Sequence, residues 1–143
     1  MNNVLLGLLA DSILFMENRT NQLKSIRPEI SIAIGNASAN ELFQMQTLRP
    51  ILKFQNELIL ASFKNYLGDV RISFHEMTDE KKDDCIHQTI KKNLALKSVM
   101  LGFIIGHFTS DELVFYSQQK SEFNKRMVEL LIKRISDQKE KLF

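Results

Sequence analysis

The stretch SVMLGFIIGHFTSDELVFY, residues 98–116, decides the fold, because it joins the most apolar part of the chain directly to a polar segment. Its apolar residues have helical spacing, and the run is shorter than the ~18 apolar residues that a membrane span needs. Thr109-x-x-Glu112 is the capping-box pattern, in which both side chains satisfy free amides at a helix start. We therefore interpret the stretch as the end of one helix and the start of the next, with His107 in a capping or packing role.

Similar signals extend the helical pattern in both directions from this stretch. Ser38-x-x-Glu41 is a second capping box, and Thr78 precedes two acids that favour a helix start. Few glycines and prolines interrupt the apolar spacing, so long helices are favoured over short strands. The predicted helices cover residues 3–35 with a kink at Pro28, about 38–67 with a kink at Pro50, 78–105, and 109–135.

Residues 28–34 allow two interpretations. Pro28 suits the first turn of a helix and Gly35 suits the position after its end, so a kinked helix that stops at Gly35 is the simpler one. The alternation of Ile30, Ile32 and Ile34 also fits a short strand. A lone strand would have no obvious partner.

Four helices of similar length with short connections predict an all-α, antiparallel, up-down-up-down four-helix bundle. The whole chain, 1–143, is expected to form a single domain. Charge supports this order, because residues 76–84 are acidic and residues 133–141 are basic. Antiparallel packing of the third and fourth helices would bring these oppositely charged ends together.

Composition excludes several classes of protein. The net charge is only +2, without a basic block, so nucleic-acid binding is not indicated. Basic residues near the C-terminus alternate with acids, which is typical of a solvated helix face. One cysteine, Cys85, forms no internal disulfide, and the N-terminus lacks a signal-peptide pattern. We expect a cytoplasmic protein that does not insert into a membrane.

No catalytic or phosphate-binding motif stands out, so an enzyme is not indicated and no cofactor is expected. Asp83, Asp84 and His87 share a helical face, and a metal-binding bundle is the least favoured alternative. A solvated, acid-rich helix start explains these residues more simply.

Both prolines follow an arginine, in Arg27-Pro28 and Arg49-Pro50. If the first two helices form a hairpin, the two kinks lie near the same level and open a gap between the helices. One hypothesis is therefore a pocket for an anionic small molecule, lined by Arg27, Arg49, Lys53 and Asn56. The simpler interpretation is that Pro28 starts a helix, Pro50 bends one around the core, and the arginines extend into water.

The segment near residue 100 is apolar on almost every side, which requires deep burial or a partner. We expect a homodimer contact formed by Val99, Met100, Gly102, Phe103 and Gly106. The leading interpretation is therefore a non-enzymatic protein that acts through another protein or a second copy of itself. The alternative is a protein, binding or catalytic, that uses an anion pocket at the proline kinks.

Overall fold

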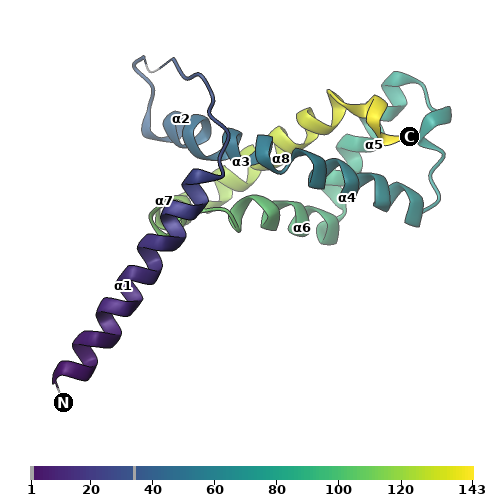
Figure 1. Ribbon diagram of the computed structural model, residues 1–143. Helices are drawn as coiled ribbons and strands as arrows, with labels where there is room; N and C mark the ends of the chain where they lie inside the picture. Colours follow the sequence, from purple (N-terminus) through teal and green to yellow (C-terminus); the bar gives the residue numbers. More distant parts are fainter. Residues whose placement is uncertain (1, 34) are drawn as a thin grey trace.

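The computed structural model describes residues 2–33 and 35–143, and within them the chain is helical without any strand (Figure 1). The all-α prediction is confirmed. The predicted bundle of four long helices is not confirmed, because the chain forms more than four helices and most of them are shorter than predicted. The α-helices are α1 (Asn2–Ser25), α2 (Ala39–Phe43), α3 (Arg49–Phe54), α4 (Asn56–Asp69), α5 (Asp79–Lys92), α6 (Leu94–Ile105), α7 (Ser110–Gln118) and α8 (Lys120–Ser136). Short π or 3₁₀ turns cover Gln44–Leu48, Phe74–Glu76 and Lys139–Leu142.

The first helix ends before Pro28, so the prediction of a helix that kinks there and continues to Gly35 is wrong. α1 stops at Ser25, and residues 28–33 are neither helix nor strand. The ring of a proline disfavours helical geometry in the residue before it, here Arg27. Ile34, which belonged to the alternative strand, lies outside the described residues.

The second predicted helix is a series of helical segments from Ala39 to Asp69. Its Ser38–Glu41 capping box is present, as predicted. Before Pro50 the helix widens into a π turn, in which the Arg49 N–H bonds to the Gln44 carbonyl five residues back. Proline lacks an N–H and its ring crowds the preceding turn, which accounts for a widened turn at this point.

The third and fourth predicted helices are each broken once, at Asn93 and at Gln119. Asn93 leaves the helical conformation, and its side chain accepts a hydrogen bond from the Leu96 N–H, so it caps α6. Gln119 separates α7 from α8 with φ −137° and ψ 44°. Each of the two predicted helices is therefore a pair of shorter helices, α5 with α6 and α7 with α8.

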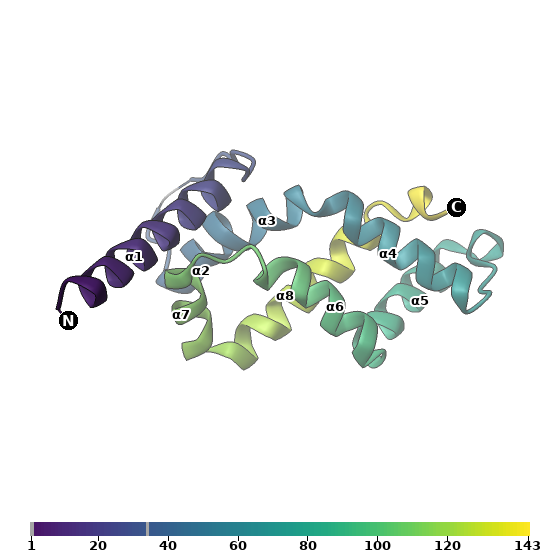
Figure 2. The ribbon, with the colours of Figure 1, turned by 60° about the horizontal axis from the view of Figure 1, so that its bottom comes forward.

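The core surrounds α8, which contacts α4, α5, α6 and α7. Two views show the body as an elongated helical assembly, with the N-terminus at one end and the C-terminus at the other (Figures 1 and 2). α8 buries one side chain at every fourth position, as its sequence pattern predicts. The fully buried residues of the core include Ile51, Ile59, Phe63, Ile86, Ile90, Met100, Ile104, Phe123, Met127, Leu131 and Ile135.

The predicted meeting of acidic and basic helix ends is confirmed. Lys139, just after α8, donates to the Asp83 carboxylate of α5 at 2.8 Å and lies 3.9 Å from Asp79. The Lys139 hydrogen bond lowers the pKa of Asp83, although partial burial opposes this effect.

α1 does not join this core, although the predicted four-helix bundle required its first helix to pack there. The helix projects from the body (Figures 1 and 2). The side chains of its apolar residues Leu5, Leu8, Leu9, Ile13 and Met16 are exposed. None of the described helices, α1 included, is both long and apolar enough to cross a membrane.

α4 ends in a turn that places an arginine in a conformation which favours glycine. The Ile72 N–H bonds to the Leu67 carbonyl and the Arg71 N–H bonds to the Gly68 carbonyl, the pattern of a Schellman cap. In that cap the residue after the helix is left-handed, and Arg71 has φ 54°. For a residue with a Cβ atom this conformation is strained by about 1 kcal/mol.

Replacing Arg71 with glycine is expected to stabilise the protein by roughly 0.5–1 kcal/mol, because the strain disappears while the cap remains. Urea denaturation followed by circular dichroism measures the change. Arg71→Ala is the control, since it removes the same exposed side chain but keeps the Cβ atom. Equal stability of the two variants would contradict a conformational origin.

Candidate functional site

A partly buried carboxylate at the start of α7, that of Glu112, joins three parts of the chain. Glu112 pairs with both terminal nitrogens of Arg27 at 2.6 Å, and it accepts the Thr47 hydroxyl at 3.0 Å. It also accepts the Thr109 N–H at 2.8 Å, while Thr109 caps α7 in return, so the predicted capping box is present. The segment after α1, the π turn before α3 and the start of α7 therefore meet at one side chain.

The pKa of Glu112 reflects these bonds. Burial alone would raise this pKa, but hydrogen bonds from Arg27, Thr109 and Thr47 outweigh burial and hold it below its ordinary value of 4.5. The carboxylate is therefore ionised in the folded protein at neutral pH.

Two arginines from the N-terminal part of the chain bind the carboxyl end of α6. Arg27 donates to the His107 carbonyl at 2.7 Å, and Arg19 donates to the Phe108 and Gly106 carbonyls at 2.9 and 3.3 Å. Carbonyls at a helix end lack helical partners and carry partial negative charge, so they attract cations. These bonds hold the last turns of α1 against the α6–α7 corner.

His107 has a packing role at the same corner, in agreement with the sequence interpretation. Its ring lies 5.4 Å from that of Phe54 in an edge-on arrangement. Burial and the nearby charges of Arg27 and Arg19 lower the pKa of His107, so the neutral imidazole is favoured.

On the N-terminal side of Arg19, α1 exposes an extensive apolar surface to water. Nine large side chains within residues 4–16 each expose more than half of their surface: Val4, Leu5, Leu6, Leu8, Leu9, Ile13, Leu14, Phe15 and Met16. Single exposed apolar residues are ordinary, but a contiguous apolar surface of this size marks an interaction site.

One side of α1 has the spacing of a coiled-coil seam. Leu6, Leu9, Ile13 and Met16 follow one another at intervals of three, four and three residues, which is the heptad repeat of apolar contact positions. Asp11, the one charged residue among residues 2–16, lies on the opposite side of the helix at 100° per residue. We call these four apolar residues the α1 seam.

A second feature is a groove between α3 and α8, with a volume of about 480 Å³. It contains five basic side chains and two acidic ones, Arg49, Lys53, Arg126, Lys133, Arg134, Glu129 and Asp137. Arg126 and Lys133 pair with the acids on their own helix, at 3.1 and 2.8 Å. Leu52 and Leu130 contribute apolar surface between the charges.

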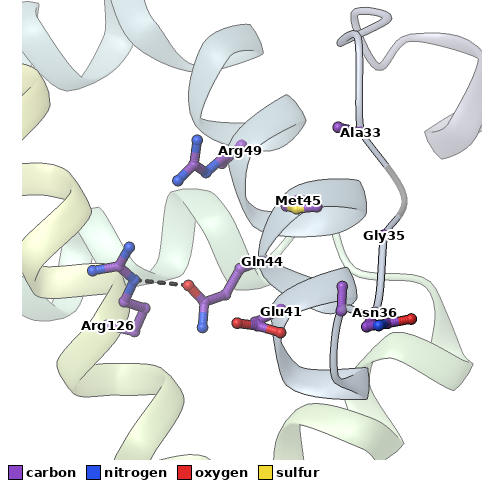
Figure 3. A pocket seen from close by; sticks show the side chains of 9 residues that line it. Ala33, Gly35, Asn36, Glu41, Gln44, Met45, Arg49 and Arg126 are labelled. Carbon is purple, nitrogen blue, oxygen red and sulfur yellow. Dashed lines mark hydrogen bonds between the residues drawn. The ribbon is translucent and has the colours of Figure 1, made fainter.

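Arg49 and Arg126 also border a neighbouring hollow beside residues 33–45 (Figure 3). Both arginines lie on the same side of that hollow, and the Arg126 Nε atom donates to the Gln44 side chain at 2.8 Å. The two hollows therefore share this pair of arginines in their linings. We call the hollow between α3 and α8 the basic groove.

The structure separates the predicted anion-binding residues into two places. Arg27 lies apart from the groove and is bound to Glu112, whereas Arg49 and Lys53 both line the groove. Asn56 does not line the groove. Its amide exchanges hydrogen bonds with Gln138 at 2.8 and 3.0 Å and accepts from Arg134 at 3.1 Å, and both of these partners do line it. Arg49, Lys53 and Asn56 are thus near one another. The hairpin of two kinked helices from which this was predicted is not what brings them together.

The predicted self-association residues occupy different environments on α6. Met100 is fully buried in the core, and Phe103 is half-buried against it. Val99, Gly102 and Gly106 are exposed, and nothing lies within 4 Å of the position that a Cβ atom on Gly102 would take. Most of the apolar surplus of α6 is thus used within the chain.

Sequence reasoning missed the part that α8 plays in the groove. The alternating bases and acids were interpreted as a solvated face, and the pairs Arg126–Glu129 and Lys133–Asp137 agree with that. The approach of α3 to this face was not visible in the sequence. Within the described residues, no three His, Cys, Asp or Glu side chains are grouped closely enough to hold a metal ion.

Comparisons with protein-family models, with curated proteins and with solved structures find no match to this chain.

Replacing Glu112 with glutamine is expected to destabilise the protein by about 2–3 kcal/mol at pH 7, because the partly buried charge of Arg27 loses its partner. The pKa of Glu112 is lowered in the folded state, so its stabilising effect is present above pH 4.5 and is lost as the pH falls below that value. Urea denaturation at several pH values should show the difference from wild type shrinking towards acid pH.

Glu129→Gln is the matched control, since it removes an exposed carboxylate paired with Arg126. We expect it to change stability by less than about 1 kcal/mol. A difference between Glu112→Gln and wild type that stayed constant from pH 7 to pH 3 would contradict the assignment.

Proposed function

We propose that this protein is a non-enzymatic interaction module that self-associates through α1. The observation that supports this most directly is the apolar surface of residues 4–16, on a helix that extends away from the body (Figure 1). A helix with apolar residues on all sides is stable when other protein surrounds it. Within the described chain, nothing packs on these residues closely enough to bury them.

The exposed area is large enough for a specific contact. Full burial of one such side chain removes on the order of 100 Å² of apolar surface from water. Nine side chains, each more than half exposed, therefore offer several hundred Å². Stable interfaces bury about 800 Å² on each partner, so α1 supplies a substantial part of such an interface.

The occupant that fits best is the α1 helix of a second copy. The spacing of the α1 seam is self-complementary, because the same residues from two helices interdigitate in a coiled coil. Asp11 lies on the side of the helix opposite the seam, so pairing two α1 seams does not bury that charge. Arg19 and Arg27 hold the other end of α1 to its own body, which leaves residues 4–16 for the partner.

Val99 and Gly102 of α6 remain a second, smaller candidate contact, because both are exposed on one helix face. They contribute far less apolar surface than α1 does.

Size-exclusion chromatography with light scattering should give a dimer for the wild type at micromolar concentration. The double variant Leu9→Glu/Ile13→Glu should be monomeric, because each charge would enter the apolar seam. Both side chains are exposed in the single chain, so the body should stay folded. Circular dichroism and a urea transition check that it does.

Val4→Glu/Phe15→Glu is the matched control. It adds the same two charges at positions that are also exposed, and more so than Leu9 and Ile13, on the side of the helix opposite the seam. We expect this variant to remain a dimer. A monomeric wild type at high micromolar concentration, or equal disruption by both double variants, would overturn self-association through the seam.

A further inference from the structure

We infer that the basic groove between α3 and α8 is a binding site for a small phosphomonoester with an apolar body. This inference is independent of the proposed self-association, because α1 contributes no residue to the groove.

The first support is the concentration of charge. Five basic and two acidic side chains give the groove a local net charge of +3, whereas the whole chain carries +2. The remainder of the protein therefore has a net charge of −1. An anion is drawn to this groove more strongly than the total charge of the chain suggests.

The second support is that three of the cations are not neutralised by an ion pair. Within the described residues, Arg49, Lys53 and Arg134 have no carboxylate within 4 Å. Arg134 is half-buried, and its guanidinium donates to the neutral amide of Asn56. Three cations around one hollow suit a dianion better than a single carboxylate, and guanidinium groups match the oxygens of phosphate.

The third support is the shape and lining of the groove. Its volume of about 480 Å³ lies in the usual range of small-molecule sites, roughly 300–1,000 Å³. Ile30 and Leu130, which are both half-buried, give it apolar lining beside the basic side chains. An inorganic ion would leave this lining in contact with water, whereas an apolar group attached to the phosphate would cover it.

Phenyl phosphate is the probe that tests this inference, in titrations of the full chain followed by calorimetry and by amide NMR shifts. We expect phenyl phosphate to bind more tightly than inorganic phosphate, benzoate or phenol at equal ionic strength. The shifts should gather on α3 and α8. Failure to bind at millimolar concentration, or shifts spread over the surface, would overturn the inference.

The variant Arg49→Gln/Lys53→Gln should weaken phenyl phosphate binding by about tenfold, since it removes two cations that no described carboxylate pairs with. Both side chains are exposed, so the fold should persist. Lys91→Gln/Lys125→Gln is the matched control, because these lysines line a different basic hollow, and it should bind like the wild type. Equal weakening by both variants would show diffuse charge attraction and overturn the inference.

The seam variant Leu9→Glu/Ile13→Glu separates this inference from the proposed function. It should be monomeric and yet bind phenyl phosphate with unchanged affinity. Loss of binding in the folded monomer would contradict a groove that belongs to a single chain.

Discussion

The position of α1 depends on one partly buried ion pair, Arg27 with Glu112. Glu112 also caps α7 and accepts the Thr47 hydroxyl, so a single carboxylate joins segments that are far apart in the sequence. A buried charge is costly without a partner, and here three donors surround it. Because Pro28 ends helical geometry at Arg27, that arginine is free to turn towards α7 instead of continuing α1. Pro28 therefore sets where the first helix stops, and the contact with Glu112 helps to set where it points.

The two ends of α1 differ in their contacts: the end near Arg19 is held by hydrogen bonds, and the projecting end exposes apolar side chains. Arg19 and Arg27 satisfy the carbonyls at the end of α6, which would otherwise lack partners in a part-buried corner. The α1 seam, by contrast, finds no covering surface in its own chain, because α8 and its neighbours already bury a complete core around Phe123 and Met127. α1 is thus fixed in direction by polar bonds while its apolar residues remain available to a partner.

Features that depend on a few neighbouring residues could be predicted from the sequence. Both capping boxes and the four-residue spacing of buried side chains on α8 are of this kind, and the structure has them. No proline or glycine lies at Asn93 or Gln119, so the helix breaks at these two residues were not predicted from the local sequence. Whether the apolar residues of α1 would be covered depends on packing across the whole chain. For the same reason Arg49 and Lys53 could be proposed as binding residues, but the contribution of Arg134 required the approach of α3 to α8.

In the proposed dimer, the folding of residues 4–16 of α1 is coupled to association with the second copy. An isolated helix is only marginally stable in water, and most helical stability in proteins comes from packing of an apolar face. The last turns of α1 have such support from the α6–α7 corner, but residues 4–16 have none within their own chain. A partner helix on the seam would supply it, and the anchored end would act as a preformed nucleus that lowers the cost of ordering the rest. The Arg27–Glu112 pair consequently supports association without touching the partner, because it keeps the end of α1 in place.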